Sequence, residues 1–396
     1  MKKHNMLTIS FLVIIFGCMI LIPLNFVLGK VGIVEVNRDN YTSYVPKEEN
    51  NIVDKLENRL ESLKNTLENH ITNNFPLYNV LNSLYQNLNF DFNKIFYNNV
   101  PLKTNSDGEY VFYDKINGLY YLESKYSHSE LTDKMNKQIN FFNNLAETGL
   151  DVYIYIPTRL ELTDIKDNNL HNFVSEFTSH LDKRITYRVM NVDNIDTYKK
   201  YFYKTDHHWT MYGALNGYES IMEMLDKTPL NNLDIVSKNE KKYYGSLAKT
   251  ALNTEVYDNI LDVDYFPDYQ VLVNHQTPDS LFKPRKIRTD RNYTYYDYYV
   301  SYFNGQYGNI IYDYQNPSQE NLLILSDSYA WQIDYLIAAS FNQTHVINLR
   351  YDEYKNKDFS LSSYVKENNI SKVLFLYEGG STIFDQYNYN FEGRIK

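Results

Sequence analysis

Residues 321–349 read NLLILSDSYAWQIDYLIAASFNQTHVINL, and their pattern is the strongest indication of the fold class. Apolar runs of strand length alternate here with segments of helical periodicity, and the alternation continues downstream. In chain order the segments are Leu322–Leu325 (strand), Tyr329–Phe341 (helix), Val346–Leu349 (strand), Phe359–Glu367 (helix) and Val373–Tyr377 (strand). Because strands that alternate with helices build parallel sheets covered on both faces, we predict an α/β domain with a parallel sheet flanked by helices.

The region before this stretch follows the same logic less regularly. A helical pattern over Glu130–Gly149 precedes a strand at Val152–Ile156, and Asp107-Gly108 before the apolar run Tyr110–Tyr113 indicates a hairpin. From about Asp226 to Tyr312 the alternation breaks into short Tyr-rich, strand-like pieces such as Tyr293–Phe303. We therefore predict a Tyr-rich β insertion at about residues 226–312, beside the sheet.

Composition excludes several classes of protein. With 43% hydrophobic and 22% charged residues among 396, the chain is too apolar to be disordered over its whole length. A net charge of −10 repels phosphate backbones, so nucleic acid is not an expected partner. The single cysteine, Cys18, excludes an intrachain disulfide and a Cys-rich metal site.

The N-terminus carries a membrane signal. Residues Met6–Val27 are uncharged and apolar, long enough to cross a bilayer once, and Lys2 and Lys3 precede them. The positive-inside rule then leaves the N-terminus in the cytoplasm and the C-terminal domain outside, as a single-pass membrane protein. A cleaved signal peptide and a secreted protein are the alternative; lipidation at Cys18 is disfavoured because the apolar run continues past it.

Three regions follow from these patterns. Residues 1–30 are a cytoplasmic tail with a transmembrane anchor or signal peptide. Residues 31–100 are helical, with one amphipathic pattern from Ile52 to Ile71 and another from Leu77 to Leu88, separated by Pro76. The first pattern is either a short coiled-coil stalk or a helix packed on the domain. Residues 101–396 form the α/β domain with its insertion.

Two short segments hold the residue types needed for nucleophilic catalysis. Residues 205–210, TDHHWT, lead into a helical pattern with Thr210 as its N-cap, which places Asp206 and His208 in the entering loop. Ser328 lies on a strand-to-helix turn, where backbone N–H groups at the helix start can face an oxyanion. A serine needs a base, and the base needs a partner to hold its tautomer, so we predict that Ser328, His208 and Asp206 converge.

These motifs resemble those of the bacterial DHHW protein family. The resemblance covers roughly Asn79–Asp385 and is carried by Tyr203–Thr210 (YKTDHHWT), Tyr244–Ser246 (YGS) and Ser326–Tyr329 (SDSY). The DHHW family is similar to the alginate O-acetyltransferase accessory proteins, whose SGNH-hydrolase-like domains carry Asp-X-His before a Gly-Asp-Ser element. The resemblance implies an SGNH-hydrolase-like fold and a Ser-His-Asp triad that works in acyl-ester chemistry on a polysaccharide acceptor. It also implies a membrane-bound O-acyltransferase partner and requires no cofactor.

One position departs from the family pattern. Ser326 stands where the related enzymes carry Gly, and a positive φ at that turn would strain any other residue. A second reading of the chain is therefore a catalytically silent scaffold or glycan-binding component of a polysaccharide modification or export complex. A third is a carbohydrate esterase that uses the same triad with water as the acceptor.

Several further residues are candidates for supporting roles. His207 is a second base candidate, disfavoured by the Asp-X-His spacing, and Asp327 is expected to brace the nucleophile turn. Trp209 fits the core better than the wall of the site, and the Gly245 N–H is either an oxyanion donor or part of a turn. Tyr329, directly after the nucleophile, can supply another oxyanion N–H.

Two charged clusters offer other readings. Asp206, His207 and His208 could ligate a metal, but no other His-rich segment supplies further ligands, and we expect no metal. The basic run Lys283, Arg285, Lys286 and Arg288 is typical of a solvated face, with contact to an anionic polymer as the functional alternative.

Overall fold

The computed structural model describes residues 78–104, 109–166, 170–237, 242–265, 268–277, 294–300, 306–355, 357–387 and 389–395. The predicted anchor at residues 6–27, the amphipathic pattern at 52–71 and the basic run at 283–288 lie outside them. Within the described ranges no helix combines the length and apolarity that a membrane crossing needs. The chain divides into two units, Met1–Asn89 and Phe90–Lys396, and the site lies in the second. The helix expected from Leu77 to Leu88 is present as α3 (Tyr78–Phe96).

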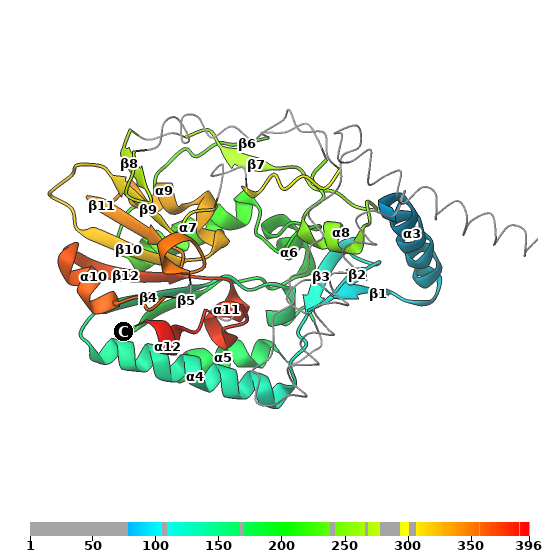
Figure 1. Cartoon of the computed structure of the whole chain (residues 1–396), viewed down its shortest axis with the longest axis horizontal. Coiled ribbons are helices and arrows are strands. Elements are labelled where there is room, and N and C mark those ends of the chain that lie inside the picture. Colours follow the sequence, from blue (N-terminus) through cyan, green and yellow to red (C-terminus); the bar gives the residue numbers. More distant parts are fainter. Residues whose placement is uncertain are drawn as a thin grey trace, which may run out of the picture. The chain divides into compact units, whose positions relative to one another are not determined.

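A seven-stranded mixed sheet forms the centre of the second unit (Figure 1). In spatial order its strands are β5 (Thr186–Val189), β4 (Asp151–Ile156), β12 (Ile370–Leu376), β10 (Asn321–Ser326), β11 (Gln343–Ile347), β9 (Asn309–Asp313) and β8 (Gln270–Val273). The strands β5, β4, β12, β10 and β11 are mutually parallel, and all but β5 lie at predicted strands. At the other edge β9 pairs antiparallel with β11, and β8 pairs antiparallel with β9. The prediction of a purely parallel sheet is therefore wrong at this edge, where part of the expected insertion extends the sheet.

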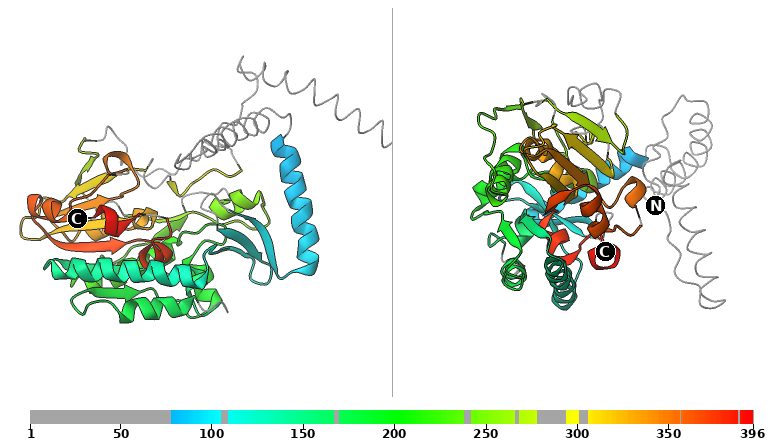
Figure 2. Two further views of the ribbon diagram at one scale, coloured as in Figure 1. Left: turned by 60° about the horizontal axis from the view of Figure 1, so that its bottom comes forward. Right: turned by 90° about the vertical axis from the view of Figure 1, so that its left-hand side faces the viewer.

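Side chains that alternate along the central strands supply two separate cores. Val373 and Phe375 of β12 point to one face, and Leu374 and Leu376 point to the other. The first face is covered by α4 (His128–Glu147), α5 (His171–Ser179), α10 (Leu361–Glu367), α11 (Gly379–Phe384) and α12 (Phe391–Arg394). The second face is covered by α6 (Ile195–Tyr201), α7 (Met211–Met224) and α9 (Asp334–Ala338). Figure 2 shows α4 running along the sheet.

The predicted helix Tyr329–Phe341 is broken in two. A 3-10 helix over Ser328–Gln332 is followed by the short α9, and almost every side chain in both is buried. A segment that is buried on all sides has no apolar-polar periodicity to favour one continuous α-helix. Packing against the surrounding core then determines where the helix breaks.

The hairpin expected near Tyr110 is present. β1 (Asn99–Thr104), β2 (Tyr110–Asp114) and β3 (Leu119–Glu123) form a small antiparallel sheet. One face of this sheet packs against α8 (Ser246–Ala251), through Leu247, Ala248 and Ala251. The insertion also contributes the antiparallel pair β6 (Ile235–Ser237) and β7 (Leu261–Val263).

The strand expected at Tyr293–Phe303 is absent from its described part, residues 294–300, which forms turns. Tyr298 and Tyr299 there are buried, with 2% and 1% of their surface exposed. Tyrosine favours strands mainly because its ring packs well on a half-buried surface. Here the rings are packed in the core from a loop, so a strand is not needed.

Candidate active site

The turn that carries Ser328 lies at the carboxyl end of the central strand β10. Ser326 ends that strand in register with Leu376 of β12. The φ angle of Ser326 is not positive, so the backbone accommodates a side chain at the position where the related enzymes have Gly. The strain expected from this departure does not arise.

The loop that carries Asp206 and His208 is closed at its base by backbone contacts. Phe202 and Trp209 form an antiparallel bridge, and the N–H of Tyr203 donates to the carbonyl of His208 at 3.1 Å. Thr210 caps α7, as expected, by accepting from the Gly213 N–H at 3.4 Å. The loop is thus a rigid support for the Asp and His side chains.

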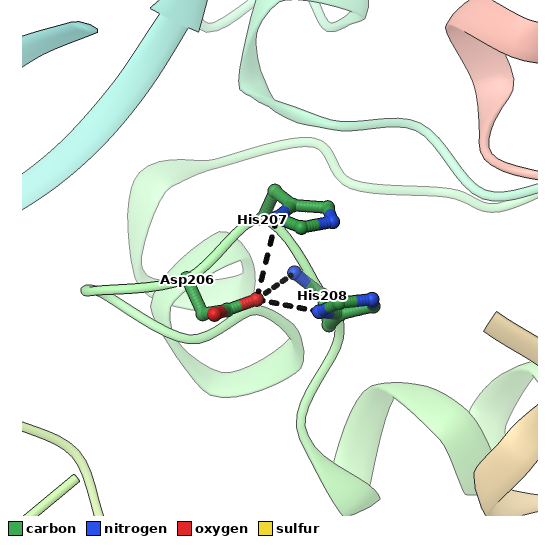
Figure 3. Close-up of side chains that lie close together, drawn as sticks. All are labelled: Asp206, His207 and His208. Carbon is green, nitrogen blue, oxygen red and sulfur yellow. Dashed lines mark hydrogen bonds and ion pairs between the residues drawn. The ribbon is translucent and has the colours of Figure 1, made fainter. Parts of the chain in front are cut away.

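Ser328, His208 and Asp206 form a continuous chain of hydrogen bonds. The distance from Ser328 Oγ to His208 Nε2 is 2.6 Å, and that from His208 Nδ1 to Asp206 Oδ1 is 2.5 Å. Figure 3 shows the Asp206 carboxylate directed at both imidazoles, with dashed contacts to each. A proton on Nδ1 held by the carboxylate leaves Nε2 as an acceptor for the serine hydroxyl, which is the arrangement a general base requires.

Asp206 is buried and accepts several hydrogen bonds. Its Oδ2 accepts from the hydroxyl of Tyr243 at 2.8 Å and from the N–H of Ser246 at 2.6 Å. Burial alone would raise the pKa of Asp206, but the neighbouring His208 and His207 rings, the hydrogen bond to His208 and the Ser246 N–H outweigh it and hold the pKa well below its usual value. Asp206 is therefore an ionised, fixed partner for His208.

Exposure rises along the chain of hydrogen bonds. Asp206 is 3% exposed and His208 7%, whereas Ser328 is partly open to solvent. A substrate can reach the hydroxyl, while the charge that orients the base stays shielded from water.

His207 has a different set of contacts from His208. Its Nδ1 lies 2.8 Å from Ser246 Oγ, and its backbone carbonyl accepts from the Tyr329 hydroxyl. Burial and the nearby His208 ring lower the pKa of His207 to about 3, so its ring is neutral at ordinary pH. Ser328 Oγ therefore contacts His208, and His207 links the loop that carries it to Ser246 and to Tyr329.

Asp327 braces the nucleophile turn. Its carboxylate accepts from the N–H of Tyr329 and from the N–H of Glu378, each at 2.9 Å, and so ties the turn to the end of β12. The Tyr329 N–H is therefore already used, which corrects the expectation that it faces an oxyanion. The Ser328 N–H comes first in the 3-10 helix, a position without an intrahelical acceptor.

Gly245 is a packing glycine. Its N–H donates to Thr205 Oγ1 at 3.0 Å, so it too is used within the protein and is not an oxyanion donor. A Cβ at this position would lie 2.5 Å from Asp206 Oδ2. Glycine is required because the chain passes directly over the carboxylate.

Aromatic residues complete the surroundings. Trp209 is fully buried beneath the site, with its ring 5.2 Å from that of Tyr329, in agreement with a core role. Sequence reasoning missed Tyr299, whose ring stacks on His208 at 3.8 Å and whose hydroxyl donates to the Ser328 carbonyl at 3.1 Å. It also missed Tyr243. Neither can be singled out among 40 tyrosines without the fold.

Asp206, His207 and His208 also cluster closely enough to be considered as metal ligands. Each facing atom already has a protein partner, because Asp206 Oδ1 and His208 Nδ1 bond each other and His207 Nδ1 faces Ser246 Oγ. The donor set fits a hydrogen-bonded triad better than a metal centre.

This arrangement can be compared with known proteins. A family model described as an SGNH hydrolase-like domain, acetyltransferase AlgX, matches residues 130–289. The fold is SGNH hydrolase-like. The predicted resemblance to the DHHW and alginate O-acetyltransferase accessory proteins is thereby confirmed, with the family model matching residues 130–289 of the chain. No curated protein sequence matches the chain.

Solved structures share this fold at low sequence identity. Bacillus cereus PatB1, solved with a sulfonyl adduct, is 19% identical with a TM-score of 0.55, over 71% of this chain and 98% of that chain. A DHHW family protein from Eubacterium siraeum is 18% identical with a TM-score of 0.53, over 74% of this chain and 97% of its own. At such identities the likeness establishes the fold alone.

Proposed function

We propose that this protein is an outward-facing, membrane-anchored acyl-ester enzyme. It transfers an acetyl or similar acyl group to an extracellular or cell-wall polysaccharide through an acyl-enzyme on Ser328. The observation that carries the proposal is the unbroken chain of hydrogen bonds from Ser328 through His208 to the buried Asp206. The match to an acetyltransferase-related SGNH-like domain favours acyl transfer over other serine chemistry.

The chemistry follows from the order of the three side chains in this chain of hydrogen bonds. His208 Nε2 takes the proton of the Ser328 hydroxyl as Oγ attacks the carbonyl carbon of an acyl donor. The developing oxyanion is assigned to the Ser328 N–H, and His208 returns the proton to the departing group as its bond to the carbonyl breaks. A sugar hydroxyl then gives its proton to His208 and attacks the acyl-serine, which restores Ser328 and leaves the sugar ester. The proposed donor is an acyl ester or thioester presented by a membrane-bound O-acyltransferase partner.

The test is to trap the acyl group. Brief exposure to an aryl acetate should add one acetyl group to the peptide that contains Ser328, detectable by mass spectrometry, and a sulfonyl fluoride should block that residue. Ser328→Ala and His208→Ala should each reduce hydrolysis of the aryl ester by roughly 10⁴-fold or more. The double variant should be little worse than either single variant, because the residues act as a unit.

Adding a sugar acceptor separates the alternatives. An acetylated sugar supports the transferase, whereas acetate alone in the presence of excess acceptor would assign a carbohydrate esterase. A wild-type protein as inert as Ser328→Ala would favour the scaffold. An unmodified Ser328 in an active sample would exclude covalent catalysis.

A further inference from the structure

Tyr299, which lies in the Tyr-rich insertion, contacts both the base and the nucleophile turn of the candidate triad. Its ring stacks on that of His208 with a centroid distance of 3.8 Å and an interplanar angle of 15°. The ring of Trp331 also stacks on Tyr299, at 5.9 Å. Because Trp331 belongs to the 3-10 helix that begins at Ser328, Tyr299 joins the base to the element that carries the nucleophile.

The hydroxyl of Tyr299 fixes the ring in this position. It donates to the backbone carbonyl of Ser328 at 3.1 Å, and only 1% of the residue surface is exposed. Burial raises the pKa of Tyr299 well above its usual value, so the side chain is a neutral phenol. A neutral phenol that already donates its proton offers His208 only the face of its ring.

The charge of His208 changes during the proposed reaction. When Nε2 takes the proton of the Ser328 hydroxyl, the ring becomes an imidazolium, and it becomes neutral again when the proton passes to the departing group. The face of a tyrosine ring attracts a cation within about 6 Å, and the attraction is stronger when the pair is shielded from water. His208 is 7% exposed, so its contact with Tyr299 meets both conditions.

The other titratable groups near His208 act differently. Among the described residues they are Asp206, His207, Asp297, Asp327 and Tyr329. Asp206 bonds Nδ1 at the edge of the ring. His207 is neutral because its pKa is lowered to about 3, and burial raises the pKa of the Tyr329 phenol well above its usual value. Burial also raises the pKa of Asp297 and that of Asp327. The carboxylate of Asp206 thus acts at the edge of the His208 ring, and Tyr299 acts on its face.

We propose that Tyr299 is a positioning residue of the triad, whose ring stabilises the imidazolium form of His208 and whose hydroxyl holds the Ser328 turn against the base. The proton passes only between Ser328 Oγ and His208 Nε2, and no bond to Tyr299 forms or breaks. The catalytic consequence rests on the proposed function. The effect on the His208 ring does not, because it can be measured in a protein that hydrolyses nothing.

NMR of the full-length protein with ¹³C-labelled histidine tests the ring contact. The His208 signal is the one of the nine histidine signals that His208→Gln removes. Tyr299→Leu replaces the aromatic face with an aliphatic side chain, so the pH at which half of the His208 rings are protonated should fall by about 0.5 to 1.5. Tyr299→Phe keeps the ring and should keep this midpoint near the wild-type value.

A second variant separates the ring's charge distribution from its packing. Replacement of Tyr299 by 4-cyanophenylalanine keeps a flat ring but withdraws electrons from its face, so the midpoint should again fall. This variant also provides the test if Tyr299→Leu does not fold. Tyr312→Leu is the control, because it removes another buried tyrosine of the same core, on β9, and should leave the His208 midpoint unchanged.

Hydrolysis of an aryl acetate gives the catalytic readout. Tyr299→Leu should lower kcat by about 3- to 30-fold, because the imidazolium loses its contact. Its KM should change little, because Tyr299 acts through His208. In Tyr299→Phe the pH profile of kcat/KM should keep its shape, and the lost hydrogen bond to the Ser328 carbonyl should cost about 2- to 10-fold.

The outcomes distinguish this proposal from the proposed function. An unchanged or raised midpoint in both Tyr299→Leu and the 4-cyanophenylalanine variant would overturn the proposal, even if activity is lost, because Tyr299 would then contribute packing alone. A fall of the same size in Tyr312→Leu would also overturn it. A lowered midpoint in a protein that hydrolyses no ester would support the ring contact and count against the proposed function only.

Discussion

Two buried polar clusters lie at the same end of the sheet. They differ in whether their hydrogen bonds and ion pairs lead to a group that is open to solvent. In the first, Asp206 and His208 lead to a hydroxyl that is open to solvent. In the second, the Arg159 guanidinium contacts the carboxylates of Glu161 at 2.6 Å, Glu378 at 2.9 Å and Glu109 at 3.5 Å, all with side chains under 10% exposed. The first cluster ends in a reactive group, and the second closes on itself.

The difference shows how burial alone misleads a search for active sites. Both clusters contain carboxyl groups with shifted pKa values, and such shifts arise in structural ion networks as well as in catalysis. Only the first offers a nucleophile with a base in reach. The two are joined physically, because the backbone N–H of Glu378 donates to Asp327, which braces the Ser328 turn. Variants in the first cluster should therefore lose ester hydrolysis, whereas variants in the second should lose stability to unfolding.

The largest effect is expected from Asp206→Asn. This change keeps the shape of the side chain but replaces an acceptor of the His208 Nδ1 proton with a group that can also donate. The base is then held in the wrong tautomer, and hydrolysis of an aryl acetate should fall by about 10⁴-fold. The melting temperature should fall as well, because the amide has one acceptor oxygen for the buried donors that the carboxylate binds with two, so hydrolysis is compared on folded variant protein. A loss below about tenfold would mean that Asp206 belongs with the structural cluster.

Arg159→Met should reduce the stability of the fold and leave ester hydrolysis largely intact, the opposite of Asp206→Asn. It leaves three carboxyl groups buried without their cation, and the free energy of unfolding should fall by about 3–5 kcal/mol. Denaturant unfolding measures this, with Arg184→Met as a control because Arg184 pairs with Asp182 at the surface. Variant protein that remains folded should retain ester hydrolysis within about tenfold. A folded Arg159→Met as inactive as Ser328→Ala would place Arg159 in the catalytic cluster.

The same cluster should give stability a pH dependence. Burial, only partly offset by Arg159, raises the pKa of Glu161 from 4.5 to about 7. The folded state therefore binds this proton more tightly than the unfolded state, and the contribution to stability is lost as pH rises from about 4.5 to about 7. Glu161→Gln should become more stable relative to wild type across that window, whereas Glu367→Gln, at an exposed position, should not. A flat difference for Glu161→Gln would contradict the assignment.

The two clusters also differ in what the sequence could reveal. Asp206 and His208 are two residues apart, and Ser328 follows an apolar strand, so the local pattern together with the family resemblance predicted their convergence. The second cluster draws its four members from three segments, and only Arg159 and Glu161 are close in sequence, so no spacing along the chain connects that pair to Glu109 and Glu378. Tyr243 and Tyr299 escaped prediction for the same reason.

The fold shows a similar division. The parallel strands and α4 were predictable from their apolar periodicity, which reports burial on one or two faces. The direction of β9 and β8 was not, because an apolar strand reads the same whichever way its neighbour runs. The broken helix after Ser328 was also hidden, since a segment buried on all sides carries no periodic signal.

A smaller effect is expected from Gly245→Ala. The new methyl group would overlap the Asp206 carboxylate and displace it from His208. A shift of about 1 Å can cost on the order of 100-fold, so activity should fall by roughly 10- to 100-fold. Gly393→Ala is the matched control, because its methyl group would meet only the flexible side chain of Asn390. Equal activities in the two variants would show that Asp206 has room to move.

The smallest effect is expected from His207→Ala. The change removes one hydrogen bond, from Nδ1 to Ser246 Oγ, and the longer 3.5 Å contact with Asp206 Oδ1, and it keeps the backbone carbonyl that accepts from Tyr329. The net value of one such bond corresponds to about a 2- to 10-fold loss of activity. Because burial lowers the pKa of His207 to about 3, its ring is neutral above that pH, and the pH profile of kcat/KM above pH 4 should keep its shape. His208→Ala, by contrast, should abolish the activity that the profile measures. A His207→Ala variant as inactive as His208→Ala, or a shifted profile, would move the base to His207 and overturn the assignment of the triad.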